Sequence, residues 1–191
     1  MAATPLTFRL ATEQDADVLE NLINKAFLAD RTTQVFLPGD DRAAQSVTSA
    51  ASMRATIARP DCAVLVATDT DGTLVAHCTV RRHDDRRSWA WFGLLAVDER
   101  LQGRGLGGQM LAYTEEYAQR EFGAERLEFS LVNTRAELIA FYSKRGYRPT
   151  GATTPFPYDS HPGWENTFRA DLHFVVFGKD VEGALGSTAP E

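Results

Sequence analysis

The stretch Asp98-Glu-Arg-Leu-Gln-Gly-Arg-Gly-Leu-Gly-Gly108 decides the fold, because it joins a strand-like run to a helix-like one. The run before it, Trp89–Val97, is apolar and aromatic, as expected of a strand covered on both faces. After it, Leu106, Met110 and Tyr113 recur at helical spacing, so the glycines lie where a helix begins. The first turn of a helix offers amide N–H groups that have no intrahelical partner, and glycines let a ligand approach them closely. The stretch therefore predicts a phosphate-binding turn.

One alternative for this turn is a dinucleotide site, because Gly103–Gly108 also satisfies GxGxxG and Glu128 lies about where a ribose-binding acid is expected. Three features argue against it. The charged linker Asp98–Gln102 separates the glycines from the strand, Glu128 falls near the start of the strand Arg126–Val132, and little chain remains for further strand-helix-strand units. The sequence has no GxxxxGK[ST], so a nucleoside-triphosphate loop is excluded.

Two further patterns indicate a different ligand. Gln102-Gly-Arg-Gly105-Leu-Gly107 fits Q/R-x-x-G-x-G/A. Phe141-Tyr-Ser-Lys-Arg-Gly-Tyr147 fits FY-x-x-x-G-[FY], and it follows a second strand and a helix over Arg135–Arg145. In this pairing the chain resembles the GNAT superfamily of acyl-CoA-dependent N-acyltransferases. The resemblance implies one acyltransferase domain over residues 6–181. The ends, residues 1–5 and the small, polar tail 182–191, are expected to be flexible.

The order of the elements predicts an α/β (α+β) fold, with strands at both ends and in the middle of the chain and helices between them. We expect a mixed, mostly antiparallel central sheet with helices on both faces. The resemblance adds that the two central strands, Trp89–Val97 and Leu127–Val132, splay apart and that coenzyme A enters the gap.

In the first third of the chain, Leu6–Leu10 alternates like an edge strand, and Thr12 is placed to cap a helix that runs to about Ala29. A second helix is expected from about Asp41 to Ile57. By resemblance, the region between these helices borders the acyl acceptor. The buried stripe predicted for the first helix is Val18, Leu19, Leu22, Ile23, Ala26 and Phe27.

Further along, Cys62–Thr68 and Thr73–Val80 read as two strands, and the turn Asp69-Thr-Asp-Gly72 predicts a hairpin between them. Prolines and glycines in Arg148–Trp164 predict an irregular loop. A final strand is expected over Asp171–Phe177.

Composition bounds the function. The chain has 191 residues, enough for one domain, and its net charge of -6 comes from 20 Lys+Arg against 26 Asp+Glu. This balance argues against nucleic acid and anionic membrane as partners. Cys62 and Cys78 have no further cysteine or nearby histidine with which to form a metal site. We expect them to be buried free thiols in a reducing compartment. No basic-then-apolar leader opens the chain, so we expect a cytoplasmic protein without a metal.

The resemblance assigns acetyl-CoA as the co-substrate. Amides of the glycine turn would hold its pyrophosphate, and the central strand would bind its pantetheine arm. The residues so implied in cofactor binding are Leu95, Ala96, Val97, Gln102, Gly103, Arg104, Gly105, Leu106, Gly107, Gly108, Arg135 and Phe141.

Tyr142 is the predicted catalytic residue. It occupies the position from which many members of the superfamily protonate the departing thiolate. A phenol suits that role, because it keeps its proton at neutral pH and can donate it at short range. The alternative is that Tyr142 is an aromatic residue that only packs on the sheet.

A general base cannot be carried over by position, because the places where members of the superfamily carry one hold Trp91 and Ser130 here. A relay of ordered waters is an equal alternative. The remaining candidates for a base are Glu128, His173, Tyr158, Asp159 and His161. The residues expected near the acceptor are Phe27, Trp91, Ser130, Tyr158 and His173, with Phe156 and Trp164 as further aromatic candidates.

The sequence therefore predicts an N-acetyltransferase that acts on a small-molecule amine such as a polyamine, an amino acid, an amino sugar or an amine toxin. Two alternatives stay open: acetylation of a protein N-terminus or lysine, and a catalytically silent acyl-CoA-binding module. The oligomeric state also stays open, with a homodimer as one option.

Overall fold

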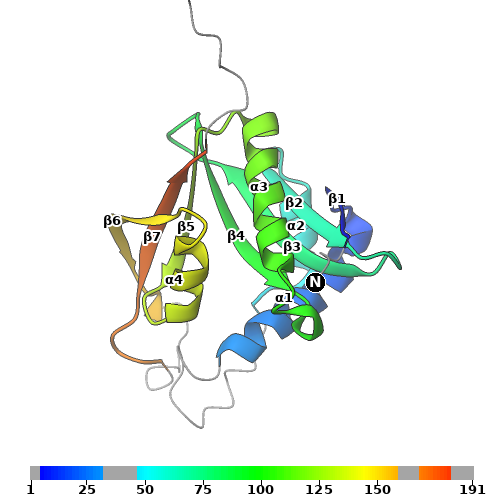
Figure 1. Ribbon diagram of the computed structural model, residues 1–191, viewed down its shortest axis with the longest axis horizontal. Coiled ribbons are helices and arrows are strands. Elements are labelled where there is room, and N and C mark those ends of the chain that lie inside the picture. The colour runs from blue at the N-terminus through cyan, green and yellow to red at the C-terminus, as the bar shows by residue number, and fades with distance from the viewer. Residues whose placement is uncertain (1–4, 32–46, 159–167, 182–191) are drawn as a thin grey trace, which may run out of the picture.

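The structure is a computed structural model, which describes residues 5–31, 47–158 and 168–181. Over these residues the chain forms one mixed sheet in the order β1-β2-β3-β4-β5-β7-β6 (Figure 1). The predicted fold class is confirmed. The strands are β1 (Thr7–Leu10), β2 (Cys62–Thr68), β3 (Leu74–Arg82), β4 (Trp89–Val97), β5 (Arg126–Val132), β6 (Arg148–Pro155) and β7 (His173–Asp180).

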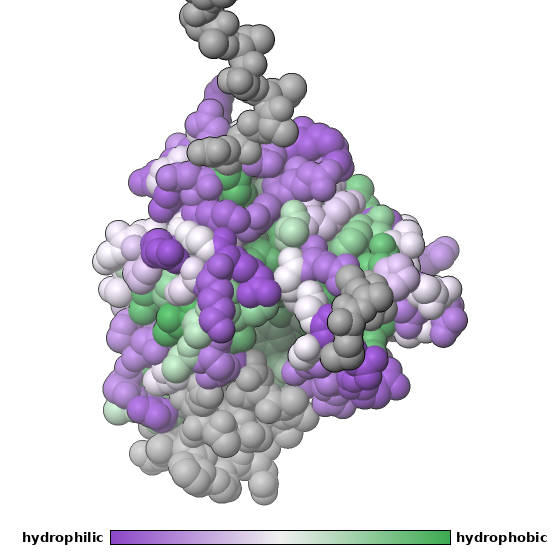
Figure 2. All heavy atoms as spheres, in the orientation of Figure 1, coloured by the Kyte–Doolittle hydropathy of each residue, from purple (hydrophilic) through white to green (hydrophobic). Residues whose placement is uncertain are grey.

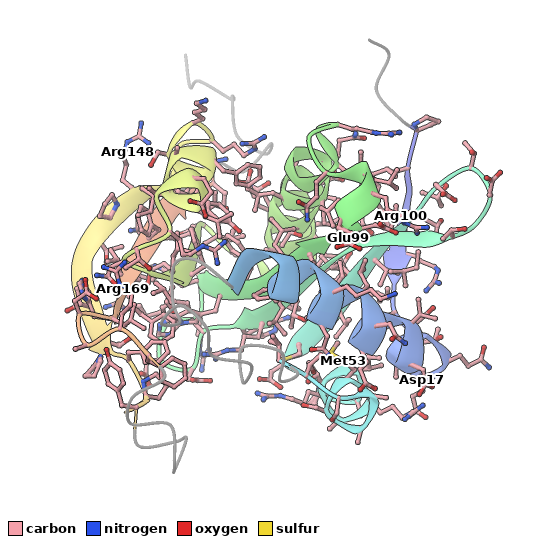
Figure 3. The ribbon with its side chains drawn as sticks, turned by 90° about the horizontal axis from the view of Figure 1, so that it is seen from below. Asp17, Met53, Glu99, Arg100, Arg148 and Arg169 are labelled. Atoms are coloured by element: carbon pink, nitrogen blue, oxygen red, sulfur yellow. The ribbon has the colours of Figure 1, made fainter. Side chains whose placement is uncertain are left out.

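Helices cover both faces of the sheet. On β2, Leu65 packs in one core cluster with Met110, whereas its neighbour Val66 packs in the other cluster with Leu19 and Met53. Successive strand residues point to opposite faces, so α1 and α2 cover one face and α3 and α4 the other. Met53 and Asp17 lie on the same side of the sheet in Figure 3. The helices are α1 (Ala16–Arg31), α2 (Ala50–Ile57), α3 (Leu106–Phe122) and α4 (Ala136–Ser143), with single 3₁₀ turns η1 (Glu13–Asp15) and η3 (Glu99–Leu101).

The two central strands separate, as expected. β4 and β5 are parallel neighbours, and their pairing covers only Trp89–Trp91 against Arg126–Glu128. Beyond these residues β4 continues to Val97 and β5 to Val132. Over that length β4 stays paired with β3, and β5 stays paired with β7. The sheet therefore opens between β4 and β5.

The first two helices differ in detail from the prediction. Thr12 is the N-cap of the 3₁₀ turn η1, which leads into α1, and its backbone N–H donates to Asp15 Oδ2 at 2.7 Å. Val18 was wrongly placed in the buried stripe, because its side chain is 50% exposed. The second helix was expected to run without a break to Ile57, but within the described residues it begins at Ala50, because Ser49 Oγ accepts from the backbone N–H of Ser52 and caps it there. Residues 32–46 lie outside the described part of the chain.

The hairpin between β2 and β3 is confirmed. Gly72 takes the positive φ of 78° that the turn requires, and Asp69 Oδ1 accepts from the backbone N–H groups of Asp71 and Thr73. Cys78 is buried on β3, whereas Cys62 is only half-buried, and both are free thiols. Burial raises the pKa of Cys78 to about 12, so this thiol stays protonated. Among the described residues, no group of His, Cys, Asp and Glu could hold a metal ion.

The predicted loop after Tyr147 is wrong in its first half, which forms the edge strand β6. A strand at the edge of a sheet tolerates proline, because one row of its N–H groups has no ladder partner. The register with β7 shifts between Pro149 and Thr153. The last strand, β7, begins two residues later than predicted and extends to Asp180. Within the described residues, no helix is long and apolar enough to span a membrane.

Candidate active site

A cleft of about 990 Å³ opens where β4 and β5 separate. Both strands line it, together with the glycine turn, α4 and the end of α1. In Figure 2, apolar residues lie at the bottom of a hollow near the middle of the face that is turned toward the viewer. The residues that the sequence placed in cofactor binding line this cleft, apart from Arg104. They are Leu95, Ala96, Val97, Gln102, Gly103, Gly105, Leu106, Gly107, Gly108, Arg135 and Phe141.

The glycine turn is shaped by backbone conformations that favour glycine. Gly103 and Gly105 have φ of 74° and 85°, in the left-handed region, and Gly105 is the N-cap of α3. Gln102 Nε2 donates to the carbonyl of Val97 at 3.3 Å and so ties the turn to the end of β4. The N-terminus of a 17-residue helix therefore faces the cleft, which is an arrangement suited to an anion.

Arg145 adds a positive charge beside this turn. Its guanidinium lies 3.7 Å from the ring centroid of Phe141, and Nη1 donates to the carbonyl of Phe141 at 2.8 Å. A Cβ on Gly108 would lie 2.8 Å from Arg145 Nη2, so a side chain at 108 would displace the guanidinium. The sequence reading missed Arg145. Arg145 lies just beyond the end of α4, four residues after Phe141, and this spacing lets its side chain reach back to Phe141.

Across the cleft, β4 contains a bulge. The register with β3 runs from His77 opposite Ala96 to Thr79 opposite Gly93, so β4 has one extra residue there. At the bulge Leu94 has a φ of 52°, which is unusual for a residue with a branched side chain. The residues of the bulge line the cleft, so the extra residue re-aims this piece of backbone toward it.

His77 holds the bulge in place from β3. Its Nδ1 lies 2.8 Å from the carbonyl oxygen of Leu94, and its Nε2 lies 3.1 Å from Thr79 Oγ1. Complete burial lowers the pKa of His77 to about 4, so the ring is neutral at pH 7. A carbonyl only accepts, so Nδ1 carries the proton and Nε2 accepts from the threonine hydroxyl. The sequence reading did not single out His77, although a lone histidine in an apolar strand is a signal.

Tyr142 lies on the wall formed by α4. It lines the cleft with only 7% of its surface exposed, and its ring centroid is 4.1 Å from that of Phe129. Burial raises the pKa of Tyr142 well above its usual value, so the phenol is protonated at neutral pH. No hydrogen bond to its hydroxyl forms within the described part of the chain. The geometry is compatible with proton donation into the cleft and with packing alone.

Of the residues expected near the acceptor, the structure brings Phe27, Ser130 and Phe156 to the cleft. Trp91 does not line it, and its ring stacks on His83 with 5.8 Å between centroids. The Tyr158 hydroxyl is occupied elsewhere, because it donates to the carbonyl of Arg169 at 2.7 Å. His173 is not among the lining residues and pairs with Pro155 on the neighbouring strand.

The structure does not bring the described candidates for a general base to the cleft. Glu128 is buried in an ion pair with Arg126 at 2.9 Å and is not among the lining residues. Asp159, His161 and Trp164 lie outside the described residues. At the start of α4, Arg135 and Glu137 line the cleft and form an ion pair at 3.0 Å.

A model of the Acetyltransferase (GNAT) family matches residues 25–147. Among solved structures, yncA from Salmonella typhimurium with its cofactor acetyl-CoA is similar at 19% identity and a TM-score of 0.67, over 98% of this chain and 99% of that one. Nourseothricin acetyltransferase is similar at 19% identity and a TM-score of 0.65, over 94% and 100%. A spermidine N-acetyltransferase chimera from Vibrio cholerae and hSSAT is similar at 12% identity and a TM-score of 0.66, over 92% and 95%. No match was found among curated proteins. At these identities the structures show a shared fold, and their different acceptors show that the fold does not decide the acceptor.

Proposed function

Because this chain belongs to the GNAT family of acetyltransferases, we propose that it transfers the acetyl group of acetyl-CoA to a primary amine of a small molecule. The observation that carries the proposal is the separation of β4 from β5, which opens a cleft between the glycine turn and Tyr142. A donor with a diphosphate at one end and a thioester at the other fits such a cleft. The cytoplasm and a small-molecule acceptor remain proposals, the former supported by the free thiols Cys62 and Cys78.

The glycine turn fits the diphosphate of coenzyme A. The positive end of α3 and the guanidinium of Arg145 both favour an anion there. Gly108 leaves space that a Cβ would fill, next to that guanidinium. Acetyl-CoA supplies the activated acyl group, and the protein positions it.

The bulge of β4 supplies the polar wall for the thioester. Transfer to an amine builds negative charge on the thioester oxygen, and backbone N–H groups aimed at that oxygen stabilise it. His77 fixes the peptide plane of Leu94 and therefore the direction of the neighbouring amides.

Tyr142 has the role of the acid in this proposal. When the bond from carbonyl carbon to sulfur breaks, the electron pair stays on sulfur, and the phenol donates its proton there. The phenol then regains the proton that the attacking nitrogen loses, so the charges balance. Burial keeps the phenol protonated at working pH, so Tyr142 itself does not make the rate depend on pH near neutrality.

The test is thiol release from acetyl-CoA with Tyr142→Phe, with Tyr147→Phe as the matched control. Both rings belong to one aromatic cluster, with 5.9 Å between centroids, but only Tyr142 lines the cleft. We expect kcat to fall about 10- to 100-fold for Tyr142→Phe and to stay within about twofold for Tyr147→Phe. Undiminished turnover of Tyr142→Phe at every pH would remove the acid role. Acetyl-CoA binding without thiol release for any amine would favour the silent binding module.

A further inference from the structure

The cleft has two chemically different walls, because the strand residues that line it alternate between the two faces of the sheet. On β5, Phe129 packs in the cluster beneath α3 and α4, whereas Val132 packs in a separate cluster with Phe168. Ser130 shares the face of Val132. The wall toward α3 and α4 contains the glycine turn and Tyr142, so the donor occupies it and the acceptor is left with the other wall.

The same alternation places β7 in this second wall. Phe177 stacks on Phe129, with 5.6 Å between centroids, on the side of α4. Phe174 lies three residues earlier in a stretch without a register shift, so its side chain points to the opposite face. Phe27 of α1 packs in the cluster of that same face and also lines the cleft.

We call this second wall the aromatic wall and define it by Phe27, Val132, Phe156, Phe168 and Phe174. Phe156 ties it together, because its ring centroid is 5.6 Å from that of Phe174 and 5.0 Å from that of Phe168. Among the described lining residues, the charged ones lie elsewhere, on α4 or at its two ends: Arg135, Glu137 and Arg145.

Ser130 lies beside the aromatic wall on the same face of the sheet, is exposed, and is the one polar side chain that the described residues add there. The described residues of this wall offer apolar area and no carboxylate for a second ammonium group. Glu137, the one lining carboxylate in the described part of the chain, pairs with Arg135. Desolvating a second ammonium group that has no carboxylate partner costs more free energy than a contact with an aromatic face returns.

We propose that the acceptor is a primary amine carried on an apolar or aromatic body, such as an aralkylamine, and not a polyamine or an acidic amino acid. This inference rests on the proposed function and names its substrate class. It also accounts for the absence of a positional base. An ammonium group beside an apolar wall is desolvated, which lowers its pKa and raises the fraction of neutral, nucleophilic amine.

The first test measures binding without chemistry. Calorimetric titrations of the coenzyme A complex use propylamine, butylamine, pentylamine and hexylamine, then 2-phenylethylamine, spermidine and glutamate. We expect Kd to fall about fourfold for each added methylene group and 2-phenylethylamine to bind more tightly than spermidine and glutamate. A flat alkylamine series, or tighter binding of spermidine or glutamate, would overturn the inference.

The second test adds a carboxylate to the wall. Ser130→Asp is expected to lower kcat/KM for 2-phenylethylamine about 10-fold relative to spermidine, whereas Ser130→Asn, of the same size and neutral, keeps the wild-type preference. Binding of acetyl-CoA to each variant confirms that it is folded. An unchanged preference in Ser130→Asp would contradict the placement of the amine against this wall.

The two proposals fail in different ways. Turnover of spermidine faster than 2-phenylethylamine leaves the acetyltransferase function standing and overturns the aromatic acceptor. Tighter binding of 2-phenylethylamine than of spermidine, with no thiol release for any amine, supports the apolar preference of the site and overturns the acetyltransferase function.

Discussion

Replacing His77 tests whether the bulge of β4 matters for catalysis. In His77→Leu the carbonyl of Leu94 loses the donor that holds it at 2.8 Å, and it stays buried beside an apolar side chain. An unsatisfied buried carbonyl costs about 1–3 kcal/mol of the free energy of unfolding. The positive φ of Leu94 costs roughly a further 1–2 kcal/mol, which the bulge can release by relaxing into a regular strand. Relaxation would turn the amides of the bulge away from the thioester.

We therefore expect His77→Leu to lose about 1–3 kcal/mol in urea unfolding and about 10-fold or more in kcat, with the KM for acetyl-CoA changed little. His77→Asn is the conservative variant, because its side-chain amide N–H can replace Nδ1 as the donor, and it should restore most of kcat. Thr79→Val removes only the partner of Nε2 and is the matched control for a change in the core.

The pH dependence of stability separates this role from that of a general base. The pKa of His77 is about 4 in the folded chain and 6.5 in an exposed histidine. Between these two pH values the unfolded chain binds a proton at His77 and the folded chain does not. The contribution of His77 to the free energy of unfolding is therefore fully present above pH 6.5. As the pH falls from 6.5 to 4, the free energy of unfolding decreases by up to about 3 kcal/mol. Both His77 variants should lack this component, whereas their kcat profiles near neutrality should keep the wild-type shape. Wild-type kcat in His77→Leu would refute the role of the bulge.

Three further predictions concern the cofactor turn and the core. Gly105→Ala places a side chain at a φ of 85° and should raise the KM for acetyl-CoA about 10-fold, whereas Gly123→Ala, with similar strain at φ 64° at the other end of α3, should leave KM unchanged. Arg145→Ala should weaken acetyl-CoA binding in calorimetry about 10-fold at low salt and less at high salt; equal loss at both salts would speak against a charge contact. Tyr147→Phe removes the hydrogen bond of 2.9 Å to Glu115 Oε1 and should cost about 1.5–3 kcal/mol in urea unfolding; an unchanged midpoint would contradict this.

Local patterns predicted the parts of the fold that depend on local physics. The alternation and turn chemistry of the β2–β3 hairpin and the glycines before α3 were correctly read, because neighbours in sequence determine them. β6 was missed because Pro149 and Pro155 exclude a central strand but not an edge strand, and the position of a strand within the sheet is not a local property.

The site was predicted unevenly for the same reason. Residues of the glycine turn line the cleft as expected, whereas Trp91 lies on the paired part of β4 and never reaches the opening. The clamp of His77 on Leu94 depends on the register between two strands, which differs by one residue across the bulge. Only the assembled sheet shows that difference.

The measurement that tests the central claim most directly is a crystal structure of the protein with acetyl-CoA. We predict that the diphosphate lies on the amides of Gly103–Gly108 beside Arg145, and that the sulfur lies within hydrogen-bonding distance of the Tyr142 hydroxyl. A diphosphate bound away from the start of α3, or a sulfur outside the opening between β4 and β5, would contradict the account.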